Sequence, residues 1–260
     1  LSDYVADLKD ARKRQLVQAF DSFGEKRLKT ILIIELIFTL VLVSLFTMYQ
    51  GKPILLPMWI VGISLGYAYS APPIRLKSRS WVAPVSLIFV LAVLPVLFAY
   101  YAFTFEISLF FLLSLIGLAL TVYAVIIPTE IRDYFGDKAM NIETMTVRLG
   151  LVKAPLVGIV LLTVGAILTG TAFFLEWAHG GHLWLSVFLL AMSVVVLFVL
   201  GKFKKLYSLS KEYMSSKGQT QNLVAENIVS LSAHNPQWIM LVTQAYSLMS
   251  IILLISKFLF

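Results

Sequence analysis

The sequence predicts an all-α, polytopic membrane protein built as a bundle of helices. Of its 260 residues, 59% are hydrophobic and only 13% are charged, whereas about a quarter of the residues in a soluble domain carry a charge. Seven apolar segments are each close to the roughly 20 residues that an α-helix needs to cross a bilayer. The composition and the length of the apolar segments therefore both indicate a multi-pass membrane protein.

Glycines, prolines and polar residues separate the apolar segments and mark the turns between them. The expected membrane spans are residues 30–48, 54–70, 82–103, 107–128, 152–175, 183–201 and 237–259. With residues 1–29 on one side of the membrane, that side collects all but two of the 21 lysines and arginines. The exceptions are Lys52 and Lys257. The positive-inside rule makes the basic side cytoplasmic.

The remaining composition excludes several kinds of site. The chain has no cysteine, so it has no disulfide, no thiolate nucleophile and no cysteine-based metal site. Its three histidines are too scattered for an obvious metal cage, although His179 and His182 can share one helical face. The net charge of +7 reflects the cationic cytoplasmic face rather than nucleic-acid binding.

A charged stretch at residues 130–150 separates two long apolar segments. It contains Asp133 and Asp137, with glutamates and cations around them. If the helix that enters from residues 107–129 continues through this stretch, the two aspartates lie one turn apart on one face. Paired carboxylates repel unless a cation lies between them, and hard oxygen ligands suit Mg²⁺. From spacing alone, a solvated loop that only fixes the topology is an alternative.

A second acidic stripe lies near the start of the chain. Asp3, Asp7 and Asp10 are spaced by four and three residues, which places them on one helical face. The rest of residues 1–29 predicts an amphipathic helix in the headgroup layer. The residues expected to face the membrane are Leu16, Val17, Phe20 and Phe23. Both acidic stripes are expected on the cytoplasmic side.

The loop between the second and third expected spans places cations beside hydroxyl groups. The double proline at residues 72–73 ends the preceding helix. The polar residues around it are Tyr69, Ser70, Arg75 and Lys77. Mg²⁺ bound by the aspartates, with arginine and lysine nearby, is the environment that a diphosphate requires.

These three segments resemble the motifs of the UbiA-type intramembrane prenyltransferases. Residues 133–137 (Asp-Tyr-Phe-Gly-Asp), which lead to Thr144 and to Val-Arg-Leu-Gly at residues 147–150, resemble the second aspartate motif of that family. Residues 69–77 resemble its loop after the fourth transmembrane helix, and residues 3–10 resemble its first motif. The three segments follow one another in the order of the family.

The chain departs from the family pattern at three positions. Asp3 stands where the family has Asn, the third acid of the first motif is at residue 10 rather than 11, and Asn141 replaces the usual Gly. The family fold has nine transmembrane helices, two of them before the first motif. We therefore expect residues 1–260 to be a single prenyltransferase domain that lacks its first two helices, and the first residue, Leu1, agrees with this.

The resemblance implies transfer of an isoprenyl chain from an allylic prenyl diphosphate to a lipophilic acceptor, with Mg²⁺ as cofactor. The implied metal ligands are Asp3, Asp7, Asp10, Asp133 and Asp137. The residues expected to bind the substrate are Arg75, Lys77, Arg132, Lys138, Tyr134, Tyr123 and Ser70. The residues expected to act in catalysis are Asp7, Asp133, Asp137 and Tyr69. The tyrosines would offer aromatic faces to a developing carbocation. Membrane lipids are the other expected partners, and the sequence identifies no protein partner.

Other functions fit parts of the pattern. The acceptor expected from family frequency is an aromatic quinone precursor, but a glyceryl phosphate lipid, a porphyrin side chain, a carotenoid or an internal alkene in a cyclisation are alternatives. A transporter with a coupling cation is a rival from another class. Transporter acids usually lie near the bilayer midplane, often in repeated halves, whereas here they lie at one face and no internal repeat is visible.

Overall fold

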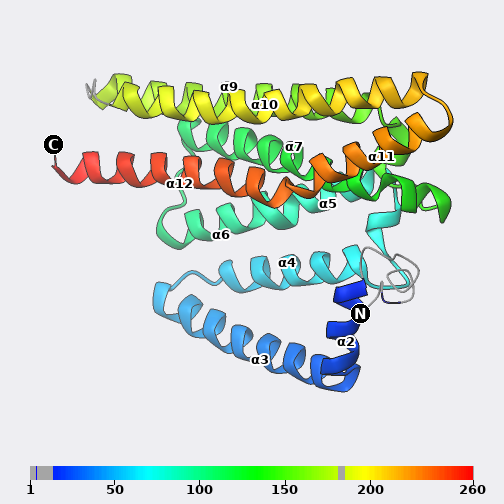
Figure 1. The fold of residues 1–260 in the computed structure, drawn as a ribbon. Coiled ribbons are helices and arrows are strands. Elements are labelled where there is room, and N and C mark those ends of the chain that lie inside the picture. Colours follow the sequence, from blue (N-terminus) through cyan, green and yellow to red (C-terminus); the bar gives the residue numbers. More distant parts are fainter. Residues whose placement is uncertain (1–3, 5–13, 181–184, 260) are drawn as a thin grey trace. The chain divides into compact units, whose positions relative to one another are not determined.

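The computed structural model describes residues 4, 14–180 and 185–259, and every regular element within them is a helix (Figure 1). This confirms the predicted all-α class. The chain folds into two compact units. Unit 1 comprises Leu1–Lys77 and Leu94–Phe105, and unit 2 comprises Ser78–Val93 and Glu106–Phe260. Each unit is described below by itself.

The described helices of unit 1 are α2 (Arg14–Phe23), α3 (Glu25–Gln50), α4 (Leu55–Ser70) and α6 (Leu94–Phe103). Gly24 joins α2 to α3 with a φ of 85°, a conformation that favours glycine. As predicted, α2 is amphipathic, and Val17 on it is buried. Phe23, which was expected to face the membrane, is 48% exposed.

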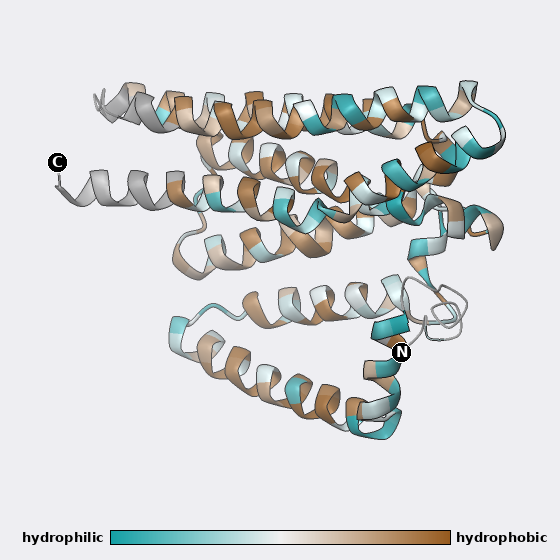
Figure 2. Cartoon of the chain, viewed as in Figure 1, coloured by the Kyte–Doolittle hydropathy of each residue, from teal (hydrophilic) through white to brown (hydrophobic). Residues whose placement is uncertain are grey.

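The long helix α3 has no buried residue. Most of its residues are apolar, as the brown stretches in Figure 2 show, and Phe38 is 62% exposed. In water this surface would carry a large hydrophobic cost. A largely apolar helix that its protein neighbours leave uncovered along most of its length is suited to lipid.

Four helices within the described residues are long and apolar enough to span a membrane. They are Glu25–Gln50, Val82–Phe103, Leu109–Ala139 and Lys153–Glu176, and they coincide with four of the seven expected spans. The expected span at 54–70 is the shorter apolar helix α4. The expected spans at 183–201 and 237–259 fall on helices α10 and α12, parts of which lie outside the residues whose side chains are described.

The described helices of unit 2 are α5 (Val82–Ile88), α7 (Leu109–Ala139), α8 (Met145–Leu149), α9 (Lys153–Gly180), α10 (Leu185–Ser215), α11 (Gly218–Ala233) and α12 (Asn235–Leu259). A π-helical turn, η3 (Phe89–Val93), follows α5. It comes just before Pro95, which has no N–H to continue a regular helix. By contrast, α7 runs on through Pro128.

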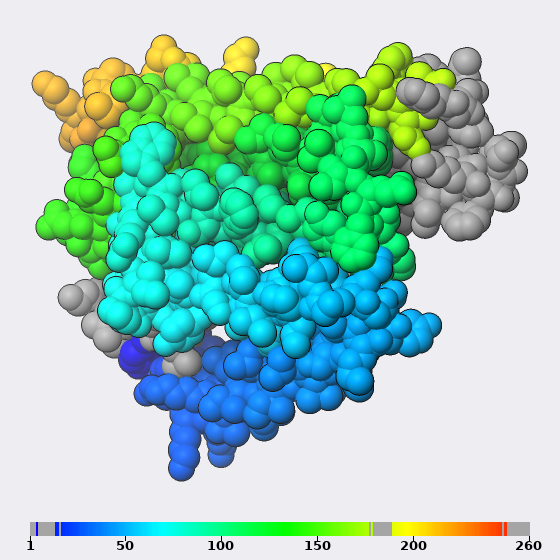
Figure 3. Space-filling model, turned by 180° about the vertical axis from the view of Figure 1, so that it is seen from behind, coloured from blue at the N-terminus to red at the C-terminus, as the bar shows by residue number. Residues whose placement is uncertain are grey.

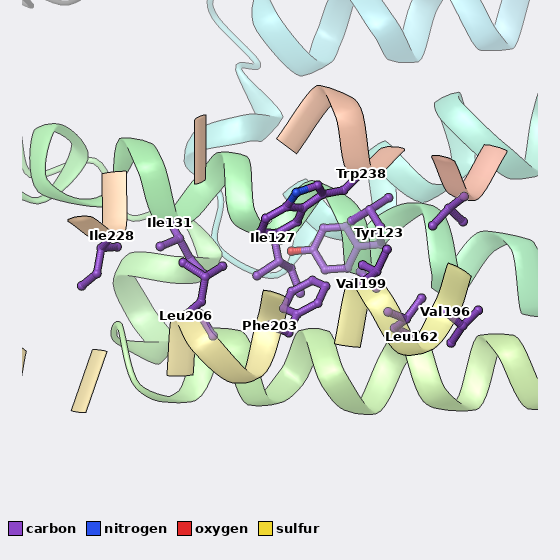
Figure 4. Packing of buried hydrophobic residues seen from close by; sticks show 14 of the residues in the cluster. Tyr123, Ile127, Ile131, Leu162, Val196, Val199, Phe203, Leu206, Ile228 and Trp238 are labelled. Carbon is purple, nitrogen blue, oxygen red and sulfur yellow. The ribbon is translucent and has the colours of Figure 1, made fainter. Parts of the chain in front are cut away.

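Helix α7 is the central element of unit 2, and α9 lies along it (Figures 1 and 3). The core of this unit joins α7 to α9, α10, α11 and α12. Figure 4 shows Tyr123 of α7 among Ile127, Phe203 and Trp238. Phe203 comes from residues 202–236, a stretch that is polar on average. This stretch forms the end of α10 and α11, and both bury apolar residues in the core.

Helices α7 and α9 approach closely at two glycines. Gly117 lies against Gly165 and Thr169, and Gly165 lies against Gly117 and Thr121. The Thr121 hydroxyl donates to the carbonyl of Gly117 in its own helix at 2.8 Å. Small residues at such a crossing let the two backbones meet, and this contact fixes the helix that carries the second acidic motif.

Candidate functional site

The second acidic motif lies on the last turns of α7. The helix begins at a cap in which the Ser108 hydroxyl accepts a hydrogen bond from the Phe111 N–H at 3.1 Å, and it continues to Ala139 without a break. The condition under which the two aspartates share one face, a helix that continues through the charged stretch, is therefore met. Asp133 and Asp137 lie one turn apart on it, and both are partly exposed.

Asp133 forms an ion pair with Arg132. The Arg132 Nε donates to Oδ1 of Asp133 at 3.1 Å, and Nη2 donates to Oδ2 at 3.3 Å. About a third of each side chain is exposed, so water screens the pair. The planar guanidinium fork suits carboxylates and phosphates alike, so the same arginine can contact a diphosphate that binds beside Asp133.

Lys138 and Tyr134 form a second pair on the same helix. The Lys138 Nζ donates to the Tyr134 hydroxyl at 3.4 Å and lies 5.5 Å from the centre of its ring. The ring is held edge-on against Phe135, with 5.4 Å between the ring centres, and Tyr134 is 8% exposed. The structure thus places a cation and an aromatic ring together on the turn that carries the two aspartates.

The end of α7 explains one departure from the family pattern. Asn141 has a φ of 54°, and its N–H donates to the Lys138 carbonyl at 3.3 Å. The N–H of Ile142 donates to the Asp137 carbonyl at 2.9 Å. These bonds form a Schellman motif, whose left-handed position is occupied mostly by glycine and sometimes by asparagine. Asn141 can therefore replace the usual Gly and still end the helix.

Glu130, for which no role was predicted, connects α7 to α8. Its Oε2 accepts a hydrogen bond from the Thr146 hydroxyl at 2.8 Å, and its Oε1 accepts one from the Tyr123 hydroxyl at 3.4 Å. The preceding residue, Thr129, accepts a hydrogen bond from the side chain of Asn235 at the start of α12. Two adjacent residues therefore hold the acidic end of α7 to two other helices. Sequence spacing gave no signal for either contact, because the partners are distant along the chain.

Tyr123 was expected to offer an aromatic face to substrate. It is 3% exposed and belongs to the core of unit 2, where its hydroxyl donates to Glu130. Its expected role in binding stays a prediction, and the packing also gives it a structural role.

The expected residues of unit 1 lie at the end of α4 and in the loop after it. Ser70 is the last residue of α4, and the N–H of Arg75 donates to the Ala71 carbonyl at 2.9 Å. Arg75 has a φ of 40°. Positive φ values are uncommon for residues other than glycine, and those that occur are concentrated at functional sites. Tyr69 and Lys77 are partly exposed.

Most of the first acidic motif lies outside the described residues, including Asp3, Asp7 and Asp10. Tyr4, next to Asp3, is described. Its hydroxyl donates to Oδ1 of Asp21 on α2 at 2.6 Å, and its ring lies 4.5 Å from that of Phe20.

The carboxylates of the described residues suit a Mg²⁺ ion that is also bound by substrate phosphates. No group of three or more histidines or acids that could hold a metal occurs among the residues that the structure describes. Mg²⁺ is usually bound by one or two carboxylates together with substrate phosphates and water. Asp133 and Asp137 provide two hard oxygen donors of this kind, so the pair fits a metal that arrives with a diphosphate.

The comparisons decide the family. The family model described as the UbiA prenyltransferase family matches residues 1–215. The chain belongs to this family. No curated protein and no solved structure gives a significant match.

Members of the UbiA family are prenyltransferases, so this chain is an integral membrane enzyme that transfers prenyl groups. The resemblance drawn from the three motifs is confirmed at the level of the family. The matched residues include all three motifs and all of α7, α8 and α9.

Proposed function

We propose that this UbiA-family enzyme transfers an isoprenyl chain from an allylic prenyl diphosphate to an aromatic quinone precursor in the membrane, with Mg²⁺ as cofactor. The observation that carries the proposal is the arrangement at the end of α7. Asp133 and Asp137 lie one turn apart, with Arg132 on the first aspartate and Lys138 next to the second. Acids and cations together at the end of a membrane-spanning helix suit a metal diphosphate better than a free cation.

The residues of α7 would hold the diphosphate. Arg132 and Lys138 would donate charge-assisted hydrogen bonds to its oxygens. Asp133 and Asp137 would bind Mg²⁺, which when bound neutralises the negative charge of the diphosphate leaving group. Arg132 already shares its guanidinium with Asp133, so a bound diphosphate would exchange one anionic partner for another.

The chemistry proceeds on the substrate. The allylic C–O bond breaks, the diphosphate leaves with the bonding electrons, and positive charge develops on the allylic carbon. An aromatic face stabilises such charge in a site without water. Tyr134 is proposed for this role together with Tyr69 and Tyr123. The electron-rich ring of the acceptor then forms the new C–C bond, and the displaced ring proton passes to a base, for which the released diphosphate suffices.

The remaining assignments rest on the sequence motifs. Asp3, Asp7 and Asp10 are proposed as further metal ligands, and Ser70, Arg75 and Lys77 as further contacts of the diphosphate. The distribution of basic residues supports an active site on the cytoplasmic face. The assignment of residues 1–260 to a single prenyltransferase domain stays a prediction.

The proposal is tested with the full chain purified in detergent. Geranylgeranyl diphosphate and Mg²⁺ are supplied with and without a dihydroxynaphthoate acceptor, and both diphosphate release and prenylated product are measured. We expect product and release that depend on acceptor and metal, and their loss in Asp137→Asn. Glu143→Gln, an exposed acid in the same stretch, is the matched control and should keep its activity.

The other outcomes identify the rival functions. Release of diphosphate without an acceptor indicates a cyclase and contradicts the aromatic acceptor. Transfer to a glyceryl phosphate lipid and none to the naphthoate would also contradict the aromatic acceptor, but it would support the prenyl diphosphate donor. Metal-dependent cation transport without any binding of an allylic diphosphate would overturn the whole proposal.

A further inference from the structure

Glu130 is an acid of the second motif region that the proposed reaction does not use. It precedes Asp133 by three residues on α7, so its spacing alone would suggest a third ligand for the metal. Its contacts suggest otherwise, because both carboxylate oxygens accept hydrogen bonds, from Thr146 at 2.8 Å and from Tyr123 at 3.4 Å. Thr146 is 1% exposed, so its contact with Glu130 is protected from water.

The contact is one of those that position α8. This helix has only five residues, too few to be stable by itself. The bond from Thr146 to Glu130 joins it to α7 across 16 positions of sequence. The neighbouring Arg148 lies over the ring of Trp81, 5.6 Å from its centre. A short helix with a cation is thus held by a buried hydrogen bond, an exposed aromatic contact and the packing of Val147 on the core of unit 2.

We propose that Glu130 is a positioning residue, which acts as a latch that holds α8 and Arg148 against the acidic end of α7. The inference rests on the proposed function, since Arg148 then belongs to the cationic surroundings of the diphosphate. Loss of the latch would loosen α8 and weaken binding of the diphosphate, while Asp133 and Asp137 keep their places on α7. Glu130 itself would contact neither metal nor substrate.

The first measurement tests the latch without any ligand. Because the chain has no cysteine, a single Met145→Cys reporter on α8 can be labelled with a maleimide without background. Met145 is 7% exposed, so labelling is slow while α8 stays in place. Thr146→Val and Glu130→Ala should each raise the labelling rate about tenfold, the change expected from loss of a hydrogen bond to a charged group. Thr243→Val removes a hydroxyl that bonds only to its own helix and should leave the rate unchanged.

The second measurement separates positioning from metal binding. Binding of magnesium pyrophosphate is followed by the shift in thermal unfolding temperature. Thr146→Val should weaken it about fivefold to tenfold. Glu130→Gln keeps an oxygen that accepts from Thr146 and an amide that can donate to Tyr123, so it should bind and label like the wild type. Glu226→Gln, at an exposed position of α11, is the matched control.

Two results would overturn the latch. One is an unchanged labelling rate in both Thr146→Val and Glu130→Ala. The other is loss of pyrophosphate binding in Glu130→Gln with normal binding in Thr146→Val, which would make the carboxylate a ligand. If the proposed function is wrong, the wild type transfers no prenyl group. The labelling rates would still show whether Glu130 holds α8 in place.

Discussion

Replacement of Gly117 by alanine should disrupt the crossing of α7 and α9. A Cβ placed on Gly117 would lie 2.8 Å from the carbonyl oxygen of Gly165 and 2.8 Å from the backbone nitrogen of Thr169, and it would overlap the Thr169 hydroxyl. Carbon atoms pack best about 3.5 to 4.0 Å from their neighbours. The obstructing atoms include backbone, so no side-chain rotation relieves the clash and the helices must separate by roughly 0.7 Å.

Separation of this size is costly along the whole interface. A gap of about 0.5 to 1 Å forfeits a quarter to a half of the dispersion energy of each contact, and overpacking usually costs about 1 to 3 kcal/mol. We expect Gly117→Ala to lower the free energy of unfolding by about 3 kcal/mol. Thermal unfolding in detergent would measure the loss, and transfer activity would fall with it because α7 carries the acidic motif.

The matched control lies on α9 itself. A Cβ on Gly170 meets nothing within 4 Å, so Gly170→Ala should be neutral or should stabilise the helix by up to about 1 kcal/mol. Equal unfolding temperatures for Gly117→Ala and Gly170→Ala would refute the close crossing.

Three further predictions concern the end of α7. Asn141→Gly should keep the wild-type stability and Asn141→Ala should lose about 1 kcal/mol, because Asn141 occupies a left-handed position; equal unfolding temperatures for the two variants would contradict the Schellman ending. Arg132→Gln should lower the Mg²⁺ concentration for half-maximal activity about twofold to fivefold, since Asp133 loses its competing partner, and should raise the KM for the diphosphate; an unchanged Mg²⁺ dependence would show that the ion pair does not compete. Trp81→Ala should weaken diphosphate binding by no more than about fivefold, because the contact with Arg148 is exposed, and a larger loss in a binding titration would indicate that Trp81 contacts the substrate.

The parts of the fold that follow from local pattern were predicted well. The charged stretch after residue 129 brings the two aspartates onto one face only if the helix continues through it, which the sequence left open, and α7 does continue through it. The length of the apolar segments predicted the membrane-spanning helices, because a helix must be that long to cross the bilayer whichever helices it packs against. An amphipathic helix was predicted within residues 1–29, and its described part, α2, is a helix of this kind.

The parts that depend on tertiary contacts were not predicted. Glu130 looked like one more charge in a charged stretch, because its partner Thr146 comes 16 residues later. Residues 202–236 looked polar on average, yet Phe203 and Ile228 within them are completely buried. Average polarity conceals an apolar face on a helix, and only the packing of α10 on α9 and of α11 on α7 reveals it.

The central claim is that Asp133 and Asp137 bind a metal diphosphate. Its most direct test is a calorimetric titration of the full chain with a prenyl thiodiphosphate, whose leaving bond reacts slowly, in Mg²⁺ and in EDTA. We predict binding in Mg²⁺, none in EDTA, and affinity at least about tenfold weaker in Asp137→Asn, since a metal ligand is lost. Equal affinity in the wild type and in Asp137→Asn, or binding that persists in EDTA, would contradict the claim.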